Sequence, residues 1–388
     1  MAMLRLPTED GRLMPYATAA PRFFPKRSGR PFTRLAFAAA HVVADPLSRK
    51  DPWLEPAIDW ERTIDYRRRL WRYGLGVAEA MDTAQRGMGL DWSTSLELIR
   101  RALAEARHHP GATIACGAGT DHLTPTPTTT IDDVIRAYEE QIGAIEAAGG
   151  RIILMASRAL AALAKSPDDY VKVYDRVLRQ LREPAIIHWL GDMFDPALAG
   201  YWGHRDLSDA MDVCLDVLAG HAAKIDGIKI SLLDKDREIT MRRRLPKGVR
   251  MYTGDDFNFA ELIAGDARGH SDALLGIFDP IAPAASAALE ALAGGDVGAF
   301  HKILEPTVPL SRHIFRAPTR FYKTGVVFMA WLNGFQDHFV MVGGQQSARS
   351  LPHLAEIFRL ADQAGLLIEP ERAAARFKAL LAVAGVEA

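Results

Sequence analysis

The 388-residue chain contains little cysteine and no excess of charge of either sign. Its two cysteines, Cys116 and Cys214, lie far apart, which argues against a disulfide framework or a zinc finger and indicates an intracellular, cytoplasmic protein. Lys and Arg number 47 against 48 Asp and Glu, and this balance argues against a nucleic-acid-binding protein. No uncharged apolar run reaches the roughly 18 residues of a membrane span, and no signal peptide begins the chain.

What the sequence does contain is a regular alternation of short apolar segments and longer amphipathic ones. Such strict alternation predicts a parallel sheet with helical crossovers, and eight units in about 260 residues match a closed (β/α)8 TIM barrel. The predicted strands are 34–43, 76–82, 111–119, 150–157, 184–192, 225–231, 249–254 and 269–275. The predicted helices are 58–74, 93–109, 129–149, 166–181, 206–221, 234–245, 256–265 and 280–295.

The alternation divides the chain into three parts. Residues 1–33 are rich in Pro, Arg and Gly and predict an irregular N-terminal arm that wraps the surface or a neighbouring subunit. Residues 34–295 form the predicted barrel, and 296–388 predict a C-terminal helical extension. A doubly wound α/β sheet is the alternative, although no glycine-rich phosphate fingerprint follows the first predicted strand. The predicted helices of the extension are 296–315, 319–336, 352–365 and 369–384.

The segment IDGIKIS (225–231) places one lysine among isoleucines. If the segment is a strand, side chains alternate between its faces, so Lys229 shares a face with Gly227 and Ser231 and not with the isoleucines beside it. Burial disfavours the charged form of a lysine and frees its amine to attack carbonyl groups. Lys229 is therefore a candidate Schiff-base residue. The alternative is a lysine that reaches water or pairs with a carboxylate.

Polar residues follow several of the other predicted strands, at the barrel end where active sites of this fold lie. His188 is a candidate proton shuttle, and Arg158 suits an acidic substrate group. Asp255 and its neighbour Asp256 could instead cap the next helix, and Gly254 could serve backbone geometry. The complete set of candidate substrate-binding residues is Asp82, Thr83, Ser157, Arg158, Gly254 and Asp255.

Three stretches of the chain resemble motifs of one enzyme family: CGAGT (116–120), GIKIS (227–231) and YTGDDFNFAELIAGDARGHSDAL (252–274). The family is that of dihydrodipicolinate synthase and N-acetylneuraminate lyase, the Schiff-base class I aldolases. In the family, the lysine of the Gly-Ile-Lys motif forms the Schiff base, which matches Lys229. The resemblance implies a TIM-barrel lyase that needs no dissociable cofactor, because the lysine does the electrophilic work. It also implies a homodimer or homotetramer.

The chain departs from the family pattern at two sites. The family's loop after strand 2, Gly-Thr-Thr-Gly-Glu, cradles the carboxylate of pyruvate, and it corresponds here to DTAQR (82–86), where only Thr83 keeps a hydroxyl. The proton-relay tyrosine at the end of strand 5 corresponds to His188, and the arginine that follows it in the synthases has no match in WLGDMFD (189–195). We therefore expect a divergent bacterial branch of the family.

The sequence and the resemblance together predict a lyase or aldolase whose substrate is a small keto acid or a keto sugar of carbohydrate metabolism. Lys229 would form the Schiff base, and the iminium would serve as the electron sink for C–C bond making or breaking, or for dehydration. His188 would shuttle the proton, and Thr83 with backbone N–H groups would hold the carbonyl or carboxylate.

Two other interpretations stay open. The first is a metal-dependent sugar isomerase or epimerase on a TIM barrel, because oxygen and nitrogen ligands of the kind that such enzymes use are present. The second is a catalytically inactive barrel with a regulatory or scaffold role. Such a protein would have no reason to retain a buried lysine, because burying an ammonium is unfavourable. The candidate metal ligands are Asp82, His188, His204, Asp206, His270 and Asp272, the last of which we expect at the carboxyl end of the eighth strand.

Overall fold

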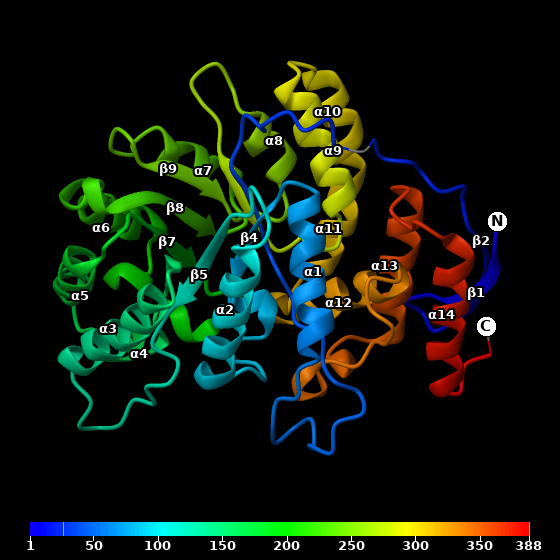
Figure 1. The fold of residues 1–388 in the computed structure, drawn as a ribbon, viewed down its shortest axis with the longest axis horizontal. Coiled ribbons are helices and arrows are strands. Elements are labelled where there is room, and N and C mark those ends of the chain that lie inside the picture. Colours follow the sequence, from blue (N-terminus) through cyan, green and yellow to red (C-terminus); the bar gives the residue numbers. More distant parts are fainter. Residues whose placement is uncertain (26, 388) are drawn as a thin grey trace.

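A computed structural model describes residues 1–25 and 27–387. Eight parallel strands close into a barrel in chain order, with the last strand hydrogen-bonded to the first. Figure 1 shows strands of this barrel with helices around them. The predicted (β/α)8 barrel is therefore confirmed. Its strands are β3 (Ala36–Ala39), β4 (Gly76–Glu79), β5 (Ile114–Ala118), β6 (Arg151–Met155), β7 (Ala185–Leu190), β8 (Ile225–Ser231), β9 (Arg250–Thr253) and β10 (Asp272–Leu275).

Helices follow the strands and cover the outside of the barrel. They are α1 (Trp60–Arg72), α2 (Trp92–Ala106), α3 (Ile131–Ala147), α5 (Pro167–Gln180), α6 (Leu207–Gly220), α7 (Lys235–Arg242), α8 (Phe259–Ala264) and α9 (Ala282–Ala293). A short helix, α4 (Arg158–Leu163), was not predicted and lies between β6 and α5. It begins at Arg158 because the Ser157 side chain accepts a hydrogen bond from the Leu160 backbone N–H at 2.9 Å and caps the helix.

Apolar side chains fill part of the barrel interior. Ile153, Ile186, Tyr252 and Leu274 belong to this inner cluster. On β8 the residue in register with Ile186 is Gly227. Two residues nearer the carboxyl ends of these strands, His188 is in register with Lys229. Because side chains alternate along a strand, Lys229 shares the inward face with Gly227. The lysine therefore lies one inward-facing position nearer the carboxyl ends of the strands than the level of Ile186 and Gly227.

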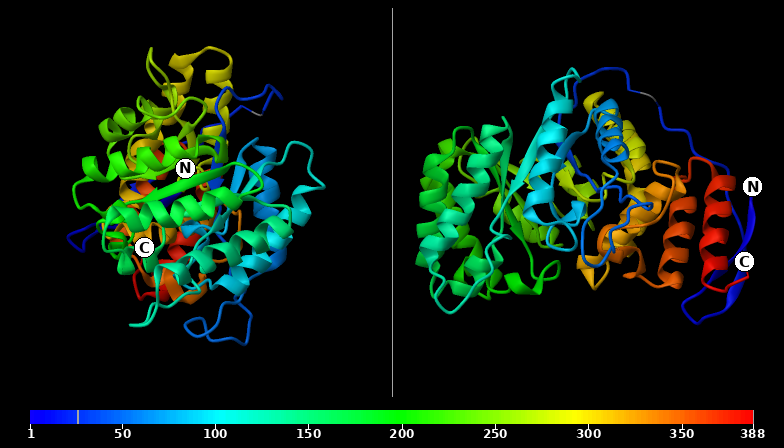
Figure 2. Two further views of the ribbon diagram at one scale, coloured as in Figure 1. Left: turned by 90° about the vertical axis from the view of Figure 1, so that its left-hand side faces the viewer. Right: turned by 60° about the horizontal axis from the view of Figure 1, so that its bottom comes forward.

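The C-terminal extension packs beside the barrel (Figure 2), and its helices are α10 (Val297–Leu304), α11 (Val308–Ile314), α12 (Tyr322–Leu332), α13 (Leu351–Gln363) and α14 (Pro370–Val383). The predicted single helix 296–315 is divided at Glu305–Thr307, a 3-10 turn with a proline at its start. Every residue of α12 is buried. This helix is therefore enclosed on all sides and carries its first residues, Tyr322 and Lys323, into the interior.

The N-terminal arm is more ordered than the sequence predicted. Residues Met3–Pro7 (β1) and Leu13–Ala17 (β2) form an antiparallel hairpin, so the expectation of a wholly irregular arm is wrong for this part. Leu4 and Leu6 are buried at alternate positions, and the Tyr16 hydroxyl donates to Asp362 of α13 at 2.8 Å. The alternating segment is only five residues long, too short to stand out among prolines and arginines.

A buried polar network ties the barrel to the extension. His41, just after β3, lies 2.9 Å through Nδ1 from the carboxylate of Asp279 and 2.9 Å through Nε2 from the Gln336 side chain. The Tyr66 hydroxyl donates to the same carboxylate at 2.8 Å.

Within residues 1–25 and 27–387, no helix combines the length and apolarity needed to cross a membrane.

Candidate active site

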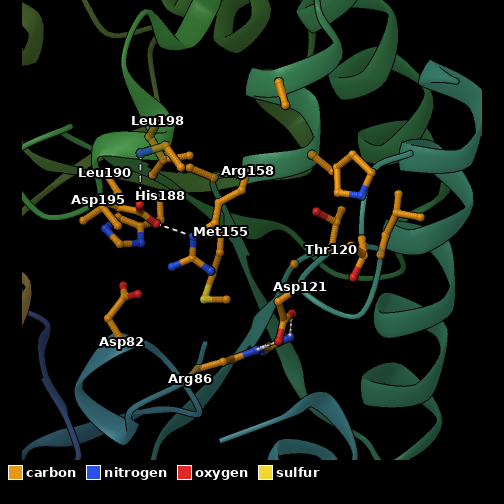
Figure 3. A pocket seen from close by; sticks show the side chains of 18 residues that line it. Asp82, Arg86, Thr120, Asp121, Met155, Arg158, His188, Leu190, Asp195 and Leu198 are labelled. Carbon is orange, nitrogen blue, oxygen red and sulfur yellow. Dashed lines mark hydrogen bonds and ion pairs between the residues drawn. The ribbon is translucent and has the colours of Figure 1, made fainter. Parts of the chain in front are cut away.

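A cavity of about 460 Å³ opens at the carboxyl ends of β4 to β7, the end at which sites of this fold lie. Figure 3 shows Asp82, Arg158 and His188 directed toward it from three different segments. A second cavity of about 380 Å³ adjoins the first. The residues shared by the two cavities are Asp82, Arg86, Arg158, Leu190 and Asp195.

Lys229 lies in the barrel interior beside this space. It is in register with His188 on β7 and with Tyr252 on β9, and its side chain is 7% exposed. The residues that line the first cavity include His188 and Asp82 but not Lys229. Of the two residues in register, His188 and Lys229, His188 is thus the one that reaches the cavity wall.

Burial and two nearby carboxylates act on the pKa of Lys229 in opposite directions. Burial lowers the pKa of Lys229, and the charges of Asp256 and Asp82 act in the opposite direction. Burial also raises the pKa of Asp256 to about 7, although one of its oxygens accepts a hydrogen bond from the Ile277 backbone N–H at 3.0 Å. Each buried group thus favours its neutral form, while their mutual attraction favours the ion pair. The amine is poised between these states.

Gly254 provides the space that the Lys229 side chain needs. A Cβ atom at residue 254 would lie 2.7 Å from Cε of Lys229 and 2.3 Å from Oγ of Ser231. The backbone carbonyl oxygen of Ile230 would lie 2.6 Å away, and a backbone atom cannot turn aside. The structure therefore gives Gly254, a predicted substrate-binding residue, a steric role. Close approach, and not a special backbone angle, is the reason for glycine here.

His188 lies at the boundary between the lysine and the cavity. Its Nε2 atom is 3.2 Å from the Ser231 hydroxyl. Burial, with the added effect of the Lys229 charge, lowers the pKa of His188 well below its usual value. The imidazole is consequently neutral near pH 7, with one nitrogen able to donate a proton and the other able to accept one.

Thr83 contacts a residue that the sequence did not single out. Its Oγ1 atom lies 2.8 Å from the hydroxyl oxygen of Tyr322, the first residue of α12, and both side chains are buried. Burial, followed by the charge of Asp82, raises the pKa of Tyr322 well above its usual value, so the phenol keeps its proton. Only the packing of the extension against the barrel brings this hydroxyl to the site, because nothing in the sequence near Tyr322 indicates a contact with the strand ends.

Two of the predicted binding residues have their polar atoms engaged by the scaffold. The Ser157 hydroxyl caps α4 and lies 2.6 Å from Oγ1 of Thr120. The Asp255 carboxylate accepts hydrogen bonds from the backbone N–H groups of Phe257 and Asn258 at 2.8 and 3.0 Å. Both residues therefore hold the loops that carry the site. The expected cap of the next helix by Asp255 is wrong, because Asn258 is the N-cap of α8 and Asp255 bonds to the turn before that helix.

Arg158 and Arg86 contribute cations to the cavity, and both have carboxylate partners. Arg158, at the start of α4, pairs with Asp195. Arg86 pairs with Asp121 at 2.6 Å and also donates to Gln141, which ties the loops after β4 and β5 together. Arg86 was not selected from the sequence, although it ends the DTAQR segment. Its charge is satisfied within the scaffold, whereas Arg158 remains directed to the cavity (Figure 3).

The metal-dependent interpretation would require a set of metal-binding side chains, and the part of the chain that the structure describes contains none. No group of three or more His, Cys, Asp or Glu side chains is arranged there to hold an ion. Asp272 begins β10 and accepts a hydrogen bond from the Leu35 backbone N–H at 2.8 Å, so its expected position at the carboxyl end of the last strand is wrong. Asp206 caps α6.

Comparison with known proteins gives one family and one fold. The family model described as "Protein of unknown function (DUF993)" matches residues 4–386. No curated protein matches the chain. Among solved structures, the chain is similar to YagE of E. coli K12, a prophage protein of the dihydrodipicolinic acid synthase family in complex with pyruvate, with a TM-score of 0.67 and 13% identity over 86% of this chain and 99% of that one.

Two synthases are also similar to the chain. The dihydrodipicolinate synthase from Aquifex aeolicus has a TM-score of 0.64 and 12% identity over 87% of this chain and 99% of its own. The chloride-inhibited synthase from Acinetobacter baumannii, complexed with pyruvate, has a TM-score of 0.62 and 14% identity over 86% and 99%. At these identities the likeness concerns the fold, and at that level the resemblance to this family is confirmed.

Proposed function

We propose that the chain, which belongs to the DUF993 family, is a lyase of the Schiff-base class I aldolase type that acts on a small keto acid or keto sugar. The observation that carries this proposal is the environment of Lys229. Its amine is buried inside a TIM barrel, burial lowers its pKa, and a neutral imidazole is the neighbouring residue in register. The likeness to a structure that holds pyruvate, a keto acid, supports the substrate class.

The chemistry would begin with attack of the neutral Lys229 amine on a ketone carbon. The carbonyl oxygen takes up two protons, one that the lysine nitrogen loses and one from a proton donor of the site, and leaves as water, which produces an iminium ion on the lysine nitrogen. The iminium then accepts the electron pair of a C–C or C–H bond at the adjacent carbon and stores it as an enamine. Reprotonation of that carbon, or its attack on an aldehyde, is followed by hydrolysis that restores the free amine.

Two groups could move the protons that these steps require. His188 is neutral and lies beside the lysine, so it can donate from one nitrogen and accept at the other. The hydroxyl pair of Thr83 and Tyr322 forms a second route, since two hydroxyls 2.8 Å apart can pass a proton along a hydrogen bond. We assign proton transfer at the carbonyl oxygen to His188 and positioning of that oxygen to the Thr83–Tyr322 pair.

The remaining cavity residues would bind the substrate. Asp82 faces the cavity and can accept a hydrogen bond from a substrate hydroxyl, while Arg158 can bind an acidic group (Figure 3). Lys229 supplies the electrophilic iminium itself, so the proposed reaction draws on no dissociable cofactor. We also expect a homodimer or homotetramer, which analytical ultracentrifugation would establish.

Borohydride trapping tests the proposal. The protein is incubated with a panel of keto acids and keto sugars, reduced, and examined by intact mass and peptide mapping. We expect a stable adduct on Lys229 that is absent in Lys229→Ala and unchanged in Lys247→Ala, a control at an exposed lysine before β9. Mapping is essential, because Lys323 is also buried and lines the second cavity. No adduct with any member of the panel, or an adduct only on Lys323, would contradict the assignment.

A further inference from the structure

Lys323 is a second buried lysine, supplied by the C-terminal extension. It is the second residue of α12, and its side chain is 4% exposed. Its ammonium donates to the backbone carbonyl of Arg320 at 3.0 Å and approaches the sulfur of Met88 at 3.4 Å. Neither partner carries a charge. Burying an ammonium without a bound anion is unfavourable, so its retention here requires an explanation.

The cavity around Lys323 is rich in cations. Its charged lining consists of Arg86, Arg158, Arg320 and Lys323 together with the carboxylates of Asp82 and Asp195. Arg86 pairs with Asp121 and Arg158 pairs with Asp195, so these carboxylates offer little compensation to Arg320 and Lys323. Arg320 is exposed, and its guanidinium lies 4.9 Å from the ring centre of Phe321. Among the described residues, neither Arg320 nor Lys323 forms an ion pair with a carboxylate, so both can donate to an anion that enters this cavity.

The second cavity is continuous with the first through shared lining. Asp82, Arg158 and Leu190 contribute to both walls. A single small molecule can therefore have its reacting carbonyl near His188 and its other end beside Lys323. The wall between these points also contains the apolar residues Leu190 and Phe194, which suit the carbon chain that would join the two ends.

We propose that Lys323 and Arg320 form a subsite for an anionic group, a carboxylate or a phosphate, at the end of the substrate away from the reacting carbonyl. This inference rests on the proposed function and names its substrate class: a keto acid or keto sugar that carries a second, distal anionic group. The subsite is built by the C-terminal extension, so the extension takes part in substrate selection. Ammonium and guanidinium groups are suited to this task because charge-assisted hydrogen bonds to anions are the strong ones.

Calorimetric titration with inorganic phosphate and with succinate tests the subsite without any reaction. We expect the wild-type protein to bind at least one of these anions, and the preferred one distinguishes a phosphate site from a carboxylate site. Loss of one charge-assisted hydrogen bond should weaken binding about tenfold or more in Lys323→Met and in Arg320→Gln. Lys247→Met, at an exposed lysine before β9, is the matched control and should bind like the wild type.

Arg320→Gln keeps the test valid if Lys323→Met does not fold, because Arg320 is exposed and its replacement leaves the interior unchanged. Circular dichroism establishes the fold of each variant before titration. The inference is wrong if the wild-type protein binds neither anion, or if the folded variants bind as tightly as the wild type. An anion that binds equally well to all variants would be an adventitious ion only.

A second measurement separates this inference from the proposed function. Borohydride trapping on the wild-type protein compares 2-oxoglutarate, a keto acid with a distal carboxylate, with pyruvate, which has none. We expect half-maximal trapping at a lower concentration of the diacid, and this preference should fall about tenfold in Arg320→Gln. Trapping without any preference contradicts the subsite and leaves the Schiff base standing, whereas anion binding without trapping contradicts the Schiff base alone.

Discussion

The hydroxyl groups of Thr83 and Tyr322 lie 2.8 Å apart, although 239 residues separate them in the chain. One follows a barrel strand, and the other begins a buried helix of the C-terminal extension. The contact joins the two parts of the molecule at the site. It means that the barrel alone does not contain all the groups that we assign to catalysis.

Replacing Tyr322 by phenylalanine removes only this hydroxyl. The ring stacks on Phe315 with centroids 4.3 Å apart, and phenylalanine preserves that contact. We expect iminium formation to slow by about 10²-fold, within the range for a lost hydrogen-bond donor that holds the substrate oxygen. The free energy of unfolding should fall by only about 1 kcal/mol, as for one neutral hydrogen bond. Rapid-quench borohydride trapping gives the rate, and Tyr16→Phe, in the N-terminal hairpin, is the control. An unchanged rate would remove Tyr322 from the mechanism.

Gly254→Ala should abolish adduct formation. The new Cβ would lie 2.7 Å from Cε of Lys229 and 2.6 Å from a backbone oxygen, so the lysine must leave its position. Overpacking of this kind also destabilises a protein by about 1–3 kcal/mol. Gly220→Ala is the matched control, because a Cβ there meets nothing within 4 Å. Trapping at the wild-type rate in Gly254→Ala would show that the amine does not need this space.

Asp256→Asn should shift the pH dependence of trapping to lower pH. The Asp256 charge raises the pKa of Lys229 against the effect of burial, so its removal lets the amine lose its proton at lower pH. Asparagine can still accept the hydrogen bond from the Ile277 backbone N–H. The rate of adduct formation is measured from pH 5 to 9, and we expect its rising limb to move toward acid. A rising limb at the same pH in the variant and the wild type would mean that Asp256 does not affect the titration of Lys229.

Glu238→Gln should remove a pH-dependent loss of stability. Burial raises the pKa of Glu238 to about 8, and its Oε1 atom accepts a hydrogen bond from the Ser271 hydroxyl at 2.6 Å. The folded state binds this proton more tightly than the unfolded state, so stability is retained below pH 4.5 and falls as the pH rises to about 8. This loss amounts to about 3 kcal/mol in urea unfolding of the wild type between pH 5 and 8. The glutamine variant should lack it, and the exposed Glu387→Gln should retain it.

Binding of succinate should weaken as the pH rises through about 8. Burial lowers the pKa of Lys323 to about 8, with Asp82 and Asp195 opposing this effect and Arg158 and Arg320 reinforcing it. The ammonium is therefore charged at neutral pH and loses its charge at mildly alkaline pH, where succinate stays fully ionised. Titration at pH 7, 8 and 9 gives the affinities. Wild-type affinity that is constant over this range would exclude Lys323 as the anion-binding group.

The alternation of apolar and amphipathic segments was sufficient to predict the barrel, because a strand and a helix bury their residues with different periods. Lys229 was identified for a related reason: a charge in a short β-branched segment contradicts the local pattern. The N-terminal hairpin escaped prediction because Leu4 and Leu6 give only two repeats of a strand period. Asp272 was assigned to the wrong end of its strand, since strand boundaries are set by hydrogen bonds that the sequence does not reveal.

The sequence by itself determined the order of strands and helices in the barrel and the face that Lys229 shares with Gly227 and Ser231, since both follow from local periodicity. Only the tertiary structure decided which of the residues that follow the strands face the cavity and which, like Ser157 and Asp255, accept hydrogen bonds from nearby backbone N–H groups. It also brought Tyr322 and Lys323 to the site from the far end of the chain. Such contacts depend on how the C-terminal helices pack against the barrel. This packing brings together residues that no local sequence pattern connects.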